Sequence, residues 1–255
     1  MENAFGQPQN VVVLGGSSDI ARAITKKLCA ARAHTIILAG RNQELLDEAA
    51  REALDYGASK TDTVIFDAED VTSASAAVAM AFDKAGDHVD LVIMAVGLLG
   101  NQLRDQSDVA AATRMMNVNF TWPVAALTEV RNRLVAQSSG RILVFSSVGA
   151  VRVRGSAYLY GGAKAGLDRL CQGMADSLIG TGVSLQLVRP GVVRTKMTEG
   201  LSEVPFTTGV NEVAQNVLKG LASGDRVIWS PPMLKYAFAI LRHLPAPVWR
   251  KVVDR

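Results

Sequence analysis

The chain has 255 residues, of which 49% are hydrophobic and 20% charged, and its formal net charge is +3. Such a length can bury a sizeable core and is common for one α/β domain. No run reaches the roughly 18 apolar residues of a membrane-spanning helix, and no signal-peptide pattern opens the chain. We therefore expect a single domain over residues 1–255, soluble or peripheral to a membrane, with 227–255 as an apolar and basic C-terminal segment.

The basic residues are concentrated at the C-terminus. From Arg226 to the end there are six Lys or Arg against one acid, Asp254, so this part carries +5 and the remainder −2. Because the net charge of the whole chain is small, we expect no nucleic-acid partner.

The two cysteines show no metal or disulfide spacing. Cys29 and Cys171 lie in apolar helical patterns, which favours core thiols in a reducing cytoplasm. We expect no metal site.

Short apolar or β-branched runs alternate with amphipathic helical patterns. The runs are Asn10–Leu14, Thr35–Ala39, Thr63–Phe66, Leu91–Val96, Arg141–Ser146 and Ser184–Val188. Such alternation predicts βαβ units and a single Rossmann-type α/β fold, a doubly wound parallel sheet with helices on both faces. The carboxyl ends of the strands then meet at one edge, where ligands bind.

A glycine-containing loop follows the first strand. It reads Gly15-Gly16-Ser17-Ser18-Asp19-Ile20-Ala21, and a helix continues through Leu28. Glycines let a backbone approach a pyrophosphate, and a helix N-terminus supplies free amides and a positive dipole end. The loop predicts a phosphate site, with an ordinary strand-to-helix turn as the alternative.

The fifth strand leads to the groups best suited to chemistry. Tyr160 and Lys164 are four residues apart and share a helical face, so an ammonium can lower the pKa of a phenol. Ser147, thirteen residues before Tyr160, can orient a carbonyl. Tyr158 lacks such a Lys, and Ser146 points to the opposite side of its strand. These residues predict proton transfer to a reducible ketone.

With the loop, the Ser and the Tyr-x-x-x-Lys pair in this order, the chain resembles the short-chain dehydrogenase/reductase family over nearly its whole length. The resemblance implies a nicotinamide dinucleotide cofactor and an enzyme that acts on a CH-OH or C=O group. It implies cofactor contacts by Gly15, Ser17, Ser18, Asp19, Ile20, Asp67, Ala68, Gly97, Tyr160, Lys164, Pro190, Val193 and Thr195.

The resemblance also implies the catalytic roles. Tyr160 would donate a proton to the carbonyl oxygen while hydride arrives from the nicotinamide, and Lys164 would stabilise the phenolate. Ser147 would bind the carbonyl, and Asn119 would hold a water that links Lys164 to solvent.

The sequence departs from the family in two loops. The first loop of the family usually reads TGxxxGxG. In this chain Leu14 replaces the Thr, and Asp19 and Ala21 replace the second and third glycines. Because a carboxylate beside a pyrophosphate is unfavourable, we expect Asp19 to cap the helix and point away. After the fourth strand, the usual Asn-Asn-Ala-Gly reads Met-Ala-Val-Gly, ending at Gly97.

Cofactor choice rests on the end of the second strand. Arg41 stands where NAD-preferring members carry an acid, and it could pair with the 2′-phosphate of NADPH. A solvated arginine is the alternative. The chain also resembles a branch of the family that uses NADH, so the choice between NADH and NADPH stays open.

The C-terminal segment is apolar, aromatic and basic. Leu234, Phe238 and Leu241 share a helical face, with Trp229 and Trp249 beyond its ends. Cations are interspersed at Lys235, Arg242, Arg250 and Lys251. The mixture favours contact with a lipid leaflet or a lipid phosphate. The alternative is a helix packed on the core or on a neighbouring subunit.

Four segments, AVGLLG, RVRGSAYLYGGAKAGLDRL, VRPGVVRTKM and LRHLP, resemble the decaprenylphosphoryl-2-keto-ribose reductases of mycobacteria and corynebacteria. That branch reduces decaprenylphosphoryl-2-keto-erythro-pentofuranose to decaprenylphosphoryl arabinose, the donor for cell-wall arabinan, after a flavin-dependent oxidase has made the ketone. The resemblance implies that oxidase as a partner, a homo-oligomer, and a cytoplasmic or peripheral location at the inner membrane surface, with the periplasmic side open.

Arg152 and Arg154 lie between Ser147 and Tyr160, where they could clamp a lipid phosphate or remain solvated. Two other functions stay open. One is a reductase of another ketone, such as a soluble carbonyl, fatty acyl or steroid compound. The other is a non-catalytic dinucleotide-binding protein, which would need none of Ser147, Tyr160 and Lys164.

Overall fold

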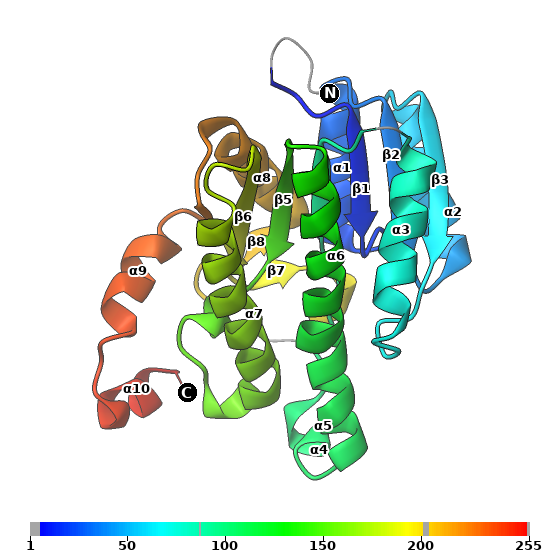
Figure 1. The fold of residues 1–255 in the computed structure, drawn as a ribbon. Coiled ribbons are helices and arrows are strands. Elements are labelled where there is room, and N and C mark those ends of the chain that lie inside the picture. The colour runs from blue at the N-terminus through cyan, green and yellow to red at the C-terminus, as the bar shows by residue number, and fades with distance from the viewer. Residues whose placement is uncertain (1–5, 87, 201–203, 254–255) are drawn as a thin grey trace.

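The computed structural model describes residues 6–86, 88–200 and 204–253. A parallel sheet of seven strands lies at its centre, in the order β3-β2-β1-β4-β5-β6-β9 (Figure 1). The strands are β1 (Asn10–Leu14), β2 (Thr35–Gly40), β3 (Lys60–Ile65), β4 (Leu91–Met94), β5 (Gly140–Phe145), β6 (Val183–Pro190) and β9 (Val227–Ser230). The strand order reverses between β1 and β4, the place where ligands bind in such sheets.

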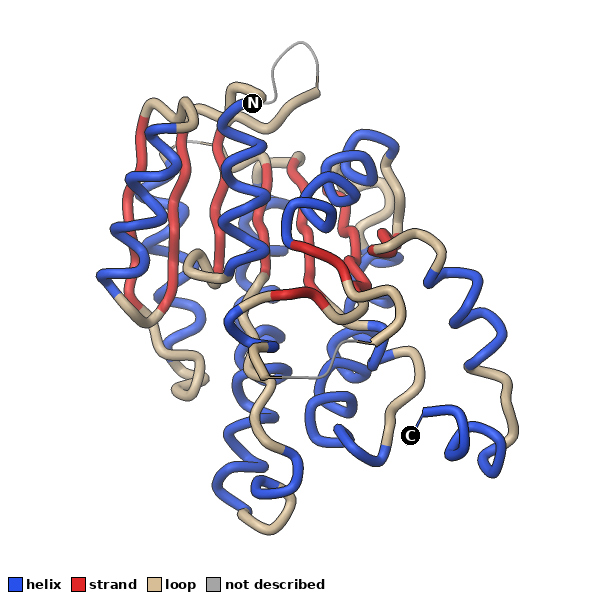
Figure 2. The backbone as a smooth tube through the Cα atoms, turned by 180° about the vertical axis from the view of Figure 1, so that it is seen from behind, coloured by secondary structure: helices blue, strands red, loops and turns tan. Residues whose placement is uncertain are grey.

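Helices cover both faces of the sheet, as Figures 1 and 2 show from opposite sides. One face carries α1 (Asp19–Ala30), α2 (Gln43–Asp55) and α8 (Val210–Ser223), and the other carries α3 (Ser73–Ala85), α6 (Trp122–Ala136) and α7 (Tyr158–Ser177). Within β1, Val12 and Leu14 pack toward one layer while Val11 and Val13 pack toward the other, because successive strand side chains alternate. The predicted doubly wound α/β fold is confirmed.

Shorter elements surround the carboxyl edge of the sheet. They are α4 (Gln102–Asp105), α5 (Val109–Met116), the π-helical turn Asn117–Thr121, the 3₁₀ turns Val148–Ala150, Gly155–Ala157 and Lys196–Thr198, the paired strands β7 (Val193–Arg194) and β8 (Thr208–Gly209), and helices α9 (Leu234–Leu241) and α10 (Ala246–Val253). Helices α9 and α10 extend from the body of the molecule (Figure 1). Within the described ranges, no helix has the length and apolarity needed to cross a membrane.

Some predicted boundaries are wrong. The third strand was expected at Thr63–Phe66 but spans Lys60–Ile65, because β2 pairs with it from Thr35 opposite Lys60. The run Val227–Ser230 was placed in the C-terminal segment, yet it is β9 and pairs with β6. Four residues are too few to show the alternation of a strand in the sequence. The strand β9 is recognised only from its pairing with the open edge of β6.

The cysteines behave as expected. Cys29 and Cys171 are buried and free, and burial raises the pKa of the Cys171 thiol to about 12. Such thiols are packing residues.

A buried ion pair fastens α7 to the sheet. The Arg189 guanidinium of β6 donates to both carboxylate oxygens of Asp168 at 2.9 and 2.7 Å. Ser146 donates to the same carboxylate at 2.6 Å, and Gln172 donates at 2.6 Å. These bonds hold the pKa of Asp168 below its ordinary value despite burial. The Arg189 guanidinium also lies over the Trp229 ring of β9, 5.1 Å from its centre.

Replacing Arg189 by Met should lower the free energy of unfolding by about 3–5 kcal/mol, because it leaves a buried carboxylate without its cation. Arg226→Met is the matched control. It breaks the exposed ion pair between Arg226 and Asp176, whose side chains are 53% and 62% exposed respectively. The free energy of unfolding should fall by about 1 kcal/mol or less. Urea unfolding followed by tryptophan fluorescence measures both, and equal losses would contradict the structural role of the pair.

Candidate active site

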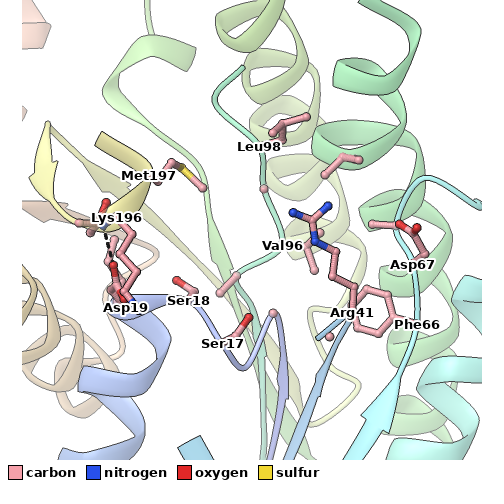
Figure 3. Close-up of a pocket in the computed structure, with 18 of the residues that line it drawn as sticks. Ser17, Ser18, Asp19, Arg41, Phe66, Asp67, Val96, Leu98, Lys196 and Met197 are labelled. Atoms are coloured by element: carbon pink, nitrogen blue, oxygen red, sulfur yellow. Dashed lines mark hydrogen bonds between the residues drawn. The ribbon is translucent and has the colours of Figure 1, made fainter. Parts of the chain in front are cut away.

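The carboxyl ends of β1 to β4 surround a cavity of about 370 Å³ (Figure 3). Many residues expected to bind the cofactor line it: Gly15, Ser17, Ser18, Asp19, Ile20, Arg41, Asp67, Ala68, Gly97 and Thr195. Tyr160, Lys164, Pro190 and Val193 lie outside this lining. The structure thus brings the loops after four strands, and the turn after β7, to one place.

The glycine loop has the shape that a bound diphosphate requires. Gly15 has φ +93°, and an added Cβ would lie 2.7 Å from the carbonyl carbon of Ala95, so only glycine is accommodated. The cap of α1 is Ser18, whose side chain accepts a long hydrogen bond from the Ala21 amide, and not Asp19 as expected. Asp19 and Ile20, in the first turn of α1, line the cavity, and the free amides of a helix N-terminus suit a diphosphate.

Two arginines line the cavity beyond β2 and β3. Arg114 donates to a carboxylate oxygen of Glu69 at 2.6 Å, whereas Arg41 is 4.0 Å from the same oxygen. The Arg41 side chain is 67% exposed and points into the cavity in Figure 3. Arg41 is therefore only weakly paired. No sequence pattern indicated Arg114, because this residue lies in α5, far along the chain from the loops that follow the strands.

Ser147 and Tyr160 lie beyond β5. Ser147 caps the turn Val148–Ala150 by accepting the Gly149 amide hydrogen at 3.1 Å. Burial raises the pKa of Tyr160, and a hydrogen bond with the Ser147 side chain acts in the opposite direction. The phenol is therefore protonated at neutral pH. The net direction is therefore upward, opposite to the lowering expected from Lys164, because burial outweighs the other influences on the pKa of this phenol.

Lys164 is buried one turn after Tyr160. It is 4% exposed, and its Nζ donates to the carbonyl oxygen of Phe145 at 2.9 Å. Burial lowers its pKa to about 8, since the charged amine is poorly solvated there. An amine with such a pKa can gain or lose a proton near neutral pH.

Asn119 and Lys164 meet at Gly97. A Cβ added to Gly97 would lie 3.2 Å from Asn119 Oδ1 and 3.5 Å from Lys164 Nζ. Asn119 sits in the π-helical turn and is fully buried. Its Oδ1 accepts the Leu98 amide hydrogen at 3.0 Å, and its Nδ2 donates to the Leu98 carbonyl at 2.8 Å. Asn119 therefore braces the loop after β4, where the family's two asparagines are missing.

The alternative Ser and Tyr are placed differently. Ser146 is buried and donates to Asp168, as its strand position predicts. Tyr158 is 44% exposed at the start of α7. Neither has the surroundings of Ser147 and Tyr160.

Arg152 joins the loop after Ser147 to the C-terminal helices. Its Nη1 donates to the carbonyl oxygens of Leu241 and Leu244 at 2.8 and 2.6 Å. Its guanidinium lies 4.4 Å from the centre of the Trp249 ring. Arg154 is partly buried, and within the described part of the chain its side chain has no hydrogen bond or ion pair, while its main-chain carbonyl accepts the Ala157 amide hydrogen at 3.2 Å.

Helix α9 also contacts the segment after β6. A Cβ added to Gly191 would lie 2.9 Å from Cδ1 of Leu234. Pro190 and Val193, on either side, are buried. The C-terminal segment is thus packed against the loop after Ser147 and against the segment after β6.

Comparison with known proteins agrees with this geometry. Residues 9–205 match the short chain dehydrogenase family. An uncharacterised oxidoreductase of Mycobacterium tuberculosis is 37% identical over 242 residues, 95% of this chain and 96% of the relative. One from Streptomyces coelicolor is 38% identical over 252 residues, 99% of each chain.

A solved short chain dehydrogenase from Burkholderia cenocepacia, in complex with NADP, superposes with a TM-score of 0.78 at 19% identity, covering 95% of this chain and 96% of that one. At this identity the superposition supports the fold, while the family match covers most of the chain. The chain therefore belongs to the short-chain dehydrogenase/reductase family and is an NAD(P)-dependent oxidoreductase.

Proposed function

We propose that this oxidoreductase reduces decaprenylphosphoryl-2-keto-erythro-pentofuranose to decaprenylphosphoryl arabinose. The observation that carries the proposal is the attachment of the C-terminal helices, by Arg152, to the loop between Ser147 and Tyr160. An apolar and basic segment thereby borders a ketone-reducing site, as a prenyl phosphate carrying a keto-sugar would require. A flavin-dependent oxidase would supply the ketone.

The side chains suit reduction. The bound cofactor supplies the hydride. The Ser147 hydroxyl orients the carbonyl, and the protonated phenol of Tyr160 donates to the developing alkoxide. Lys164, with a pKa near 8, returns a proton toward Tyr160. The second lone pair of Asn119 Oδ1 is available to a water beside Gly97, which would connect Lys164 to solvent.

Helix α9 has two apolar faces, and only one is packed. Leu234 is buried, and Phe238 contacts the Trp229 ring with centres 6.3 Å apart. The outer face of α9, made of Met233, Tyr236 and Ile240, is 54%, 71% and 69% exposed. The face expected from the sequence to meet lipid is therefore the packed one.

The outer face of α9 is proposed to receive the prenyl chain or the surface of an anionic leaflet. Lys235 and Arg242 on α9, and Arg250 and Lys251 on α10, are exposed. From Arg226 to Lys251 the sequence has no acid, so no carboxylate of this segment competes with lipid phosphates for these cations. The location that follows is peripheral to the membrane.

The two loop arginines take different roles in this proposal. The Nη1 of Arg152 is occupied by main-chain carbonyls, so Arg152 chiefly positions the C-terminal helices. Arg154 is the candidate for the lipid phosphate, because a guanidinium binds phosphate oxygens in pairs.

The structure gives a physical argument for NADPH. Arg41 is weakly paired at the cavity, and a 2′-phosphate would give it a stronger partner than Glu69 does. The resemblance to NADH-using reductases points the other way, so the assay below measures both cofactors.

Tyr160→Phe should lower kcat for ketone reduction by about 10²–10⁴-fold, because it removes the proton donor. The affinity for NADH or NADPH, measured by cofactor fluorescence, should change less than about threefold. Tyr158→Phe is the control and should keep wild-type kcat. Wild-type turnover by Tyr160→Phe would contradict the assignment.

The rate of reduction should fall as pH rises through about 8. Below that pH Lys164 carries the proton that restores Tyr160, and above it the amine is neutral. The measurement is kcat/KM for the cofactor, which reports groups of the free enzyme. Lys164→Arg stays charged at these pH values and should remove the fall in whatever activity it retains. A flat wild-type profile between about pH 7 and 9 would contradict this role of Lys164.

Turnover of the lipid-linked ketone tests the function itself. A polyprenylphosphoryl 2-keto-pentofuranose, made in place by a flavin-dependent oxidase, should be reduced to the arabino epimer with loss of NADH or NADPH absorbance. Tyr160→Phe should abolish the loss. No turnover with active oxidase and folded protein would favour reduction of a soluble ketone.

Two sets of variants test the proposed contacts with the prenyl chain and with the lipid phosphate separately. Tyr236→Asp with Ile240→Asp should raise KM about tenfold for a long prenyl chain, leave a short chain unaffected, and weaken binding to anionic vesicles. Arg154→Gln should raise KM for both chain lengths, whereas exposed Arg169→Gln should not. Equal effects of the double variant on both chain lengths would exclude prenyl contact at the outer face of α9.

A further inference from the structure

Asp19 connects the beginning of the chain to the turn that follows β7. Its Oδ2 accepts the amide hydrogen of Lys196 at 2.8 Å, across 177 residues of sequence (Figure 3). Asp19, Thr195, Lys196 and Met197 all line the cofactor cavity. The family pattern has glycine at position 19, so this connection depends on a residue that the family usually lacks.

The turn that Asp19 contacts is well formed internally. The Thr195 amide donates to Thr198 Oγ1 at 3.1 Å, and the same hydroxyl donates to the Val193 carbonyl at 2.5 Å. On its other side, β7 pairs with β8, Val193 opposite Thr208. The turn is therefore held together by its own hydrogen bonds, and the bond to Asp19 ties it to α1.

We propose that Asp19 is a positioning residue that holds the Thr195–Thr198 turn against the cofactor cavity. The carboxylate supplies an acceptor for the Lys196 amide, the first amide of its 3₁₀ turn, and so fixes the wall that a nicotinamide would meet. The inference rests on the nicotinamide cofactor of the family and is independent of the keto-sugar substrate.

The same carboxylate has an electrostatic effect of the opposite sign. It lies in a cavity that would hold a diphosphate, and like charges repel at short range. Asp19 thus weakens diphosphate binding while it fixes the turn. The two effects are separable, because the hydrogen bond needs an oxygen acceptor and the repulsion needs a charge.

Two variants separate the effect of the hydrogen bond from that of the charge repulsion. Asp19→Asn keeps an amide oxygen that can accept the Lys196 hydrogen and removes the charge, while Asp19→Ala removes both. Glu44→Gln, exposed in the first turn of α2 and outside the cavity lining, controls for the change in net charge. The probes are ADP, which reaches only the adenosine and diphosphate sites, and NADH and NADPH, which also reach the turn.

Both Asp19 variants should bind ADP more tightly than the wild type, on the order of fivefold, because one negative charge is removed. Asp19→Asn should keep this gain for NADH and NADPH, whereas Asp19→Ala should lose it. Hydrogen exchange of the Lys196 amide should accelerate in Asp19→Ala and stay near wild type in Asp19→Asn. Glu44→Gln should match the wild type throughout.

Equal dinucleotide affinity and equal exchange of the Lys196 amide in Asp19→Ala and Asp19→Asn would overturn the positioning role. Unchanged ADP affinity in both would overturn the electrostatic part. These binding measurements need no ketone, so failure of the proposed substrate would leave them interpretable.

Discussion

The carboxylate of Asp168 is the point on which the active site depends. A buried carboxylate must be fully paired, and here it receives Ser146 from β5, Arg189 from β6 and Gln172 from its own helix. These bonds fix α7 against the carboxyl ends of two strands. Ser147 follows directly after Ser146, and Tyr160 and Lys164 lie two turns and one turn before Asp168, so their relative position follows from this cluster. Arg189 extends the contacts to Trp229, and Trp229 to Phe238 of α9.

Burial also determines the protonation of Tyr160 and Lys164. It raises the pKa of Tyr160 and lowers that of Lys164, because both lose solvation for their charged forms. The protein therefore presents a neutral phenol and an amine that titrates near neutrality. A site prepared in this way is suited to donating a proton to a ketone, which is the direction in which the proposed reductase acts.

The C-terminal segment links this chemistry to the proposed substrate. Arg152 holds its main chain, and Leu234 packs on Gly191, so α9 borders the loop between Ser147 and Tyr160 on one side and the segment after β6 on the other. The outer face of α9 is left exposed beside several cations. Asp19 adds a second long-range connection, between α1 and the turn after β7, at the cofactor cavity.

The doubly wound fold, the phosphate-binding loop and the pairing of Tyr160 with Lys164 could be predicted from the sequence, because strand periodicity, the glycine loop and residue spacing are local properties. The sequence also distinguished Ser147 from Ser146, since neighbouring strand residues face opposite sides. Three features required the folded structure: Ser18 caps α1 while Asp19 bonds to Lys196, β9 joins the sheet, and Leu234 is buried. The folded structure also decided the direction of the Tyr160 pKa shift. These outcomes depend on burial and on partners distant along the chain, neither of which a local pattern contains.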